Sequence, residues 1–268
     1  MERTGNNDIE TPEGTQPIMV DNGPMRAEDR SRIRKFVVAI PRILTIIFII
    51  ILLVWITEAE GGIGSSESNV FGVHALLMGL FVTVFIQEGL LSFSAPLISP
   101  KSRNRTHLRF FHVSYHILGL TCAIVGLVAI VAYKNMSAQP LVFPYYYLFS
   151  PHSWIGVACM TLWGIQFVGG FFSQAIKAKL TVEQRKVFLK WHRFLGRAVY
   201  VIGLATCALG LQDMQSSDLA MSTPMNAPMP ASGMQGYLPY SDLAQYACIC
   251  TLLLLLLGTS TFVTFVNE

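Results

Sequence analysis

Charged side chains are scarce in this sequence. Only 13% of its 268 residues are Asp, Glu, Lys or Arg, and 52% are hydrophobic, whereas soluble domains carry about 25% charged residues. The five cysteines all lie inside apolar stretches rather than in loops where a disulfide framework would form. This composition excludes an ordinary soluble domain and a small disulfide-stapled secreted domain.

The apolar residues gather in long blocks. Each block is close to the ~20 residues that an α-helix needs to cross a ~30 Å hydrocarbon layer. The six blocks are Phe36–Ile56, Val70–Phe93, Leu108–Ala132, His152–Gln174, His192–Leu211 and Tyr246–Val266. The sequence therefore predicts an all-α, polytopic membrane protein with one domain of six transmembrane helices over residues 36–268. Residues 1–35 are polar and rich in Asn, Glu, Pro and Gly, which predicts a disordered tail.

The basic residues indicate how the chain is oriented. All but one of the 19 lysines and arginines lie in three segments, residues 1–42, 101–109 and 177–197. With six spans, these segments share one face of the membrane and the exception, Lys134, lies on the other. The positive-inside rule makes the basic face cytoplasmic, so we expect both termini in the cytoplasm. Because topology accounts for most of the basic residues, we expect no nucleic-acid partner.

Four consecutive blocks each carry a histidine near their N-terminal end: His74, His112, His152 and His192. Each one alone would be interpreted as an interfacial or hydrogen-bonded histidine, but titratable groups in membrane spans are costly and usually functional. Because successive helices alternate in direction, His74 and His152 should lie near the outer face, and His112 and His192 near the cytoplasmic face. Facing helices build cofactor sites in bundles, and imidazole is a good iron ligand. Two imidazoles per iron would leave no open coordination position, which suits electron transfer.

Two of these histidines are followed by a glycine one helical turn later. Gly156 lies on the same face as His152, and Gly196 on the same face as His192. A patch without side chains beside an imidazole would accept a flat, bulky ligand.

Five stretches of the blocks from 70 to 211 carry a family resemblance: residues 71–78, 109–116, 124–130, 148–156 and 192–198. The specific elements are His152-Ser-Trp-Ile-Gly156 and, one hairpin later, His192-Arg-Phe-Leu-Gly196. In these stretches the chain resembles the cytochrome b561 family of ascorbate-dependent transmembrane oxidoreductases. The resemblance implies six helices, a homodimer and two haems b, one held by His74 and His152 and the other by His112 and His192. It also implies electron transfer from cytoplasmic ascorbate to monodehydroascorbate or a ferric chelate across the membrane.

The resemblance also suggests substrate contacts. Arg109 and Arg185 resemble basic positions of the family and Lys190 lies nearby, so we expect them at a cytoplasmic site for the ascorbate anion; positive-inside topology alone is the alternative. His116 resembles a second histidine of the family's third helix, expected to bind a haem propionate or the donor, or else to pack in the core. Lys134 could pair with an anionic acceptor, or be a solvated lysine.

A different class of function also fits the titratable residues in the spans. Glu88 lies in the second block, and together with the histidines it could relay protons or bind a metal ion for a transporter. Family members often have glycine before this acid, whereas here Gly89 follows it.

Overall fold

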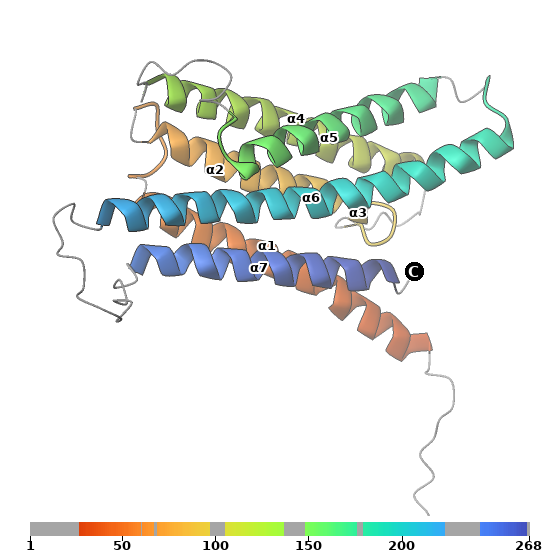
Figure 1. Cartoon of the computed structure of the whole chain (residues 1–268). Helices are drawn as coiled ribbons and strands as arrows, with labels where there is room; N and C mark the ends of the chain where they lie inside the picture. The colour runs from red at the N-terminus through yellow and green to blue at the C-terminus, as the bar shows by residue number, and fades with distance from the viewer. Residues whose placement is uncertain are drawn as a thin grey trace, which may run out of the picture.

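The computed structural model describes residues 27–59, 61–66, 69–96, 105–136, 148–175, 179–222 and 242–266. Every regular element in these ranges is a helix, which confirms the predicted all-α fold (Figure 1). Residues 1–26 of the predicted tail lie outside the described part of the chain. The remainder of that segment belongs to α1 (Ala27–Ala59), which begins before the first predicted span.

The other elements follow α1 in the order α2 (Val70–Leu80), η1 (Phe81–Ile86), α3 (Gln87–Leu91), α4 (Arg105–Met136), α5 (Pro151–Ala175), α6 (Val182–Ser222) and α7 (Asp242–Val266). Within the described ranges, five helical stretches are long and apolar enough to cross a membrane, and Tyr246–Phe262 of α7 is a shorter apolar helix. The chain is therefore an integral, multi-pass membrane protein.

The helices pack in pairs. α1 lies along α7, α2 along α4, and α5 along α6, while α6 also packs on α7 (Figure 1). Large apolar side chains such as Val128, Ile165 and Phe171 are exposed on α4 and α5. Exposed apolar side chains are expected on faces that meet lipid chains, because lipid tails are as apolar as leucine.

α6 extends beyond the predicted span His192–Leu211 at both ends. A capping box begins it: the Gln184 backbone N–H donates to Thr181 Oγ1 (3.2 Å), and the Thr181 backbone N–H donates to Gln184 Oε1 (2.9 Å). Hydropathy marks only the part of a helix that crosses the apolar layer, so it missed the polar turns after this cap. His192 consequently lies well inside α6 rather than at its start.

The second span is one continuous helical stretch over Val70–Leu91, close to the predicted Val70–Phe93, and η1 lies within it. η1 is a π-helical segment, a type of turn that is frequent at functional sites. Its Thr83 carbonyl accepts a hydrogen bond from the Thr45 hydroxyl of α1 (3.2 Å). The next residues, Gln87 and Glu88, are buried.

Candidate functional site

The four predicted histidines come together as two pairs. His74 of α2 faces His152 of α5 with 6.3 Å between ring centres, and His112 of α4 faces His192 of α6 with 6.2 Å. A metal–imidazole bond of about 2 Å on each side, with about 1 Å more from nitrogen to ring centre, places two axial imidazoles about 6 Å apart. Each pair therefore has the spacing of two ligands that share one metal ion.

Hydrogen bonds to backbone carbonyls set the orientation of three of these rings. His74 Nδ1 donates to Gly126 O of α4 (2.9 Å), and His152 Nδ1 donates to Thr206 O of α6 (2.8 Å). His112 Nδ1 donates to Gly89 O of α3 (2.7 Å). A carbonyl oxygen can only accept, so the proton is on Nδ1 and Nε2 is the nitrogen left to bind a metal.

The carbonyl partners also show how far apart the two pairs lie. Gly126, which anchors His74, is fourteen residues beyond His112 on α4, and Thr206, which anchors His152, is fourteen residues beyond His192 on α6. Fourteen residues of α-helix span about 21 Å. The same arrangement thus occurs twice: a histidine of α2 bonds to a carbonyl of α4, and a histidine of α5 bonds to a carbonyl of α6. Each pair of rings contains one histidine from α2 or α4 and one from α5 or α6.

His192 departs from this repeat. Its Nδ1 is buried and has no hydrogen-bond partner within the described residues. The ring stacks on Phe188 with 5.6 Å between ring centres. The backbone of α6 at His192 is bound to α5, because Gln166 Nε2 donates to His192 O (2.9 Å).

Glycines of the facing helix make room for two of the rings. A Cβ added to Gly210 of α6 would lie 2.8 Å from His152 Cε1, and a Cβ added to Gly170 of α5 would lie 3.2 Å from His192 Cε1. These two glycines were not singled out in the sequence, because the clash arises between helices rather than along one helix.

The two glycines that the sequence did single out have a different environment. A Cβ on Gly156 would meet the Thr206 methyl group at 3.4 Å, and a Cβ on Gly196 would meet Leu90 at 3.5 Å. Both are ordinary contacts between neighbouring helices, so these glycines border helix contacts rather than the imidazole rings.

His116 lies between the two ring pairs along α4. Its ring centre is 4.6 Å from that of His112. The Trp163 Nε1–H of α5 donates to His116 Nδ1 (3.4 Å), and Trp163 packs edge-on against Phe81 at 5.1 Å. His116 therefore belongs to an aromatic cluster among the four helices that carry the paired histidines, α2, α4, α5 and α6.

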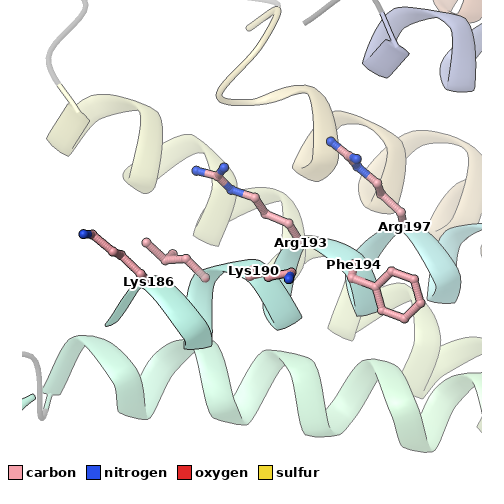
Figure 2. Close-up of a pocket in the computed structure, with 6 residues that line it drawn as sticks. Lys186, Lys190, Arg193, Phe194 and Arg197 are labelled. Atoms are coloured by element: carbon pink, nitrogen blue, oxygen red, sulfur yellow. The ribbon is translucent and has the colours of Figure 1, made fainter. Parts of the chain in front are cut away.

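A basic pocket lies along the first half of α6 (Figure 2). It is an open hollow with a volume of about 540 Å³. Its lining residues are Lys186, Leu189, Lys190, Arg193, Phe194 and Arg197. The helical period brings the four cations to one stripe of α6, and no acidic side chain lines the pocket within the described residues.

The predicted substrate residues are dispersed. Lys190 lines the basic pocket, whereas Arg185 lies half-buried one turn earlier and donates from Nε to Thr181 O (3.4 Å). Arg109 is half-buried early in α4, and Lys134 is half-buried in its last turn. Lys134 thus lies at the opposite end of α4 from Arg109.

A family model described as eukaryotic cytochrome b561 matches residues 73–217. The chain belongs to the cytochrome b561 family. All four paired histidines lie inside the matched region. Membership of the cytochrome b561 family implies haem b, and such a group is compatible with the ring spacing, with the Nε2 atoms left free on three of the rings, and with the glycines beside two of the rings.

Relatives of the chain include plant and animal proteins that are named for ascorbate-dependent or ascorbate-specific transmembrane reactions. The probable ascorbate-specific transmembrane electron transporter 2 of Oryza sativa subsp. japonica is 29% identical over 177 residues, 63% of this chain and 70% of the relative. The transmembrane ascorbate ferrireductase 1 of Arabidopsis thaliana is 30% identical over 171 residues, 62% of this chain and 66% of the relative. The transmembrane ascorbate-dependent reductase CYB561 of Bos taurus is 27% identical over 195 residues, 72% of each protein.

Proposed function

We propose that this chain is a transmembrane oxidoreductase that takes electrons from cytoplasmic ascorbate and delivers them across the membrane to monodehydroascorbate or a ferric chelate. The observation that carries the proposal is the pair of histidine couples, each spaced at about 6 Å and set about 21 Å apart along α4 and α6. The names of the relatives supply the donor and the reaction class.

Each histidine couple is proposed to hold one haem b: His74 with His152, the outer couple, and His112 with His192, the inner couple. A haem held by two imidazoles would supply reversible one-electron chemistry and would leave no position open for oxygen. The protein contributes the orientation of the ligands. Three Nδ1–H groups are bound to carbonyls, so their rings keep Nε2 directed away from the supporting helix and gain basicity.

The donor site is proposed at the basic pocket of α6. Ascorbate is an anion at neutral pH, and a cleft lined by cations raises the local concentration of an anion. The positive-inside rule supports a cytoplasmic location for this end of α6 and for both termini. Arg109 and Arg185 are proposed to add to the positive field, His116 to support the inner couple, and Lys134 to face an anionic acceptor on the other side. The functional unit is proposed to be a homodimer, as in the family.

The alternative of a metal or proton transporter depends on Glu88. That carboxylate forms an ion pair with Arg42 (2.7 Å). A proton relay or a metal site would need the Glu88 carboxylate oxygens, and Arg42 already binds them. The geometry therefore favours electron transfer.

The test uses the purified full-length protein in liposomes loaded with ascorbate, with a ferric chelate outside that cannot cross the membrane. Reduction of the chelate should require the protein and should slow when Lys190→Glu and Arg193→Glu are combined. Lys179→Glu, an exposed charge reversal outside the pocket, is the matched control and should leave the rate unchanged. A purified protein that lacks low-spin b-type absorption bands would contradict the proposal.

A further inference from the structure

An arginine of α1 forms an ion pair with Glu88, the residue before the one whose carbonyl binds His112. Arg42 Nε and Nη2 donate to the two carboxylate oxygens of Glu88, each at 2.7 Å. The two side chains are 19% and 8% exposed. A fork-to-fork arginine–carboxylate pair is among the strongest and most directional of polar contacts, and ionisable residues inside membrane spans are functional by default.

Arg42 holds a second group in the same segment. Its Nη2 also donates to the backbone carbonyl of Ala95 (2.7 Å). Arg42 therefore contacts both ends of residues 88–95, which we call the clamp segment. This segment comprises the last turn of the helical span Val70–Leu91 and the turn that follows it, and the ends of helices fray more readily than their interiors.

The clamp segment contacts His112 at two places. Gly89 O accepts the hydrogen bond of His112 Nδ1 (2.7 Å), and the Phe93 ring lies 5.4 Å from the His112 ring. Gly89 also borders His116, because a Cβ there would lie 2.7 Å from His116 Nε2. A movement of the clamp segment would therefore reach the inner couple directly.

We propose that Arg42 and Glu88 are positioning residues for the inner haem: their ion pair holds the clamp segment so that Gly89 O stays on His112 Nδ1. This inference rests on the proposed function, because it takes His112 as an iron ligand. A hydrogen bond to the distal nitrogen raises the basicity of a ligating imidazole, and a more basic ligand favours ferric over ferrous iron. The pair thereby lowers the reduction potential of the inner haem.

The sign of the shift in the inner-haem reduction potential distinguishes this positioning role from a direct effect of the two charges on the haem. If the pair acts through the hydrogen bond, Arg42→Gln and Glu88→Gln both loosen the clamp segment and both raise the inner-haem potential. If the two charges act only through their fields, removal of the positive charge lowers the potential and removal of the negative charge raises it.

The experiment is a redox titration of the purified holoprotein, followed by optical and electron paramagnetic resonance spectra of each haem. The variants are Arg42→Gln, Glu88→Gln and Arg42→Lys, which keeps the charge but loses the fork. Arg105→Gln, an exposed residue at the start of α4, is the control for loss of a cytoplasmic charge. The outer haem serves in every variant as the internal measure of correct folding.

We expect all three variants to raise the inner-haem potential, or to weaken inner-haem retention by about 10-fold or more, while the outer haem and Arg105→Gln stay as in the wild type. Shifts of opposite sign in Arg42→Gln and Glu88→Gln, no shift, or loss of both haems in all three variants would overturn the inference. A wild-type protein without two haems would instead overturn the proposed function, so the two failures are distinguishable.

Discussion

Substitution of Gly210 by alanine should selectively damage the outer histidine couple. The added Cβ would lie 2.8 Å from His152 Cε1 and 2.9 Å from His152 Nδ1. Contacts between real Cβ atoms and their neighbours are ordinary at 3.4 Å or more, so the ring would have to move by about 0.6 Å in an interior that is close-packed. That movement also strains the 2.8 Å hydrogen bond from His152 to Thr206 O.

The magnitude follows from the cost of overpacking. An extra methyl group in a well-packed core costs about 1–3 kcal/mol, which corresponds to about 5- to 150-fold weaker retention of the outer haem. Helix propensity works in the other direction, because alanine is about 1 kcal/mol more favourable than glycine in a helix. Gly164→Ala is the matched control, since a Cβ there meets nothing within 4 Å.

The assay compares haem per protein and the redox difference spectrum of the two purified variants. We expect Gly210→Ala to lose or shift one of the two haem signals and to keep the other, while Gly164→Ala keeps both. A Gly210→Ala protein with the haem content and outer-haem potential of Gly164→Ala would refute the reasoning, because the His152 ring would then not occupy the space beside Gly210.

Two further predictions concern the inner couple and the basic pocket. Gly170→Ala should perturb the inner haem less than Gly210→Ala perturbs the outer one, because its Cβ would lie 3.2 Å from His192 Cε1 rather than 2.8 Å from a ring atom. The same haem content and difference spectrum measure this. An equal or larger loss of the inner haem would contradict the larger distance between Gly170 and the His192 ring. Raising ionic strength shortens the Debye length from about 30 Å at 0.01 M to about 8 Å at 0.15 M, so the initial rate of haem reduction by ascorbate should fall severalfold at constant haem content; a rate independent of salt would argue against the basic pocket as donor site.

The membrane spans and the grouping of the four histidines could be predicted from the sequence. Hydropathy marks membrane spans because each helix must cover the hydrocarbon layer. Alternating direction then sorts His74, His112, His152 and His192 into two layers, and the structure pairs them in that way. The start of α6 was missed, because the prediction began this span at His192; the S/T-x-x-E/Q pattern of Thr181 and Gln184, which form a capping box, is the signal that marks it.

The supports of the site were beyond the reach of sequence reasoning. Backbone carbonyls such as Gly126 O and Thr206 O accept hydrogen bonds from the histidine rings. Every residue has a backbone carbonyl, so the amino-acid sequence does not indicate which one is the partner. The partners Arg42 and Glu88 are 46 residues apart, so no local pattern joins them. The π-helical η1 before the buried Glu88 was not predicted either, and its Thr83 O accepts a hydrogen bond from Thr45 of α1, which is distant in the sequence.

The pairing of the histidines is tested most directly by alanine substitution of each one, followed by the reduced-minus-oxidised spectrum of the purified protein. His74→Ala and His152→Ala should remove one and the same haem signal, and His112→Ala and His192→Ala should remove the other. Loss of a common signal in His74→Ala and His192→Ala would show that the imidazoles facing each other across about 6 Å do not share an iron.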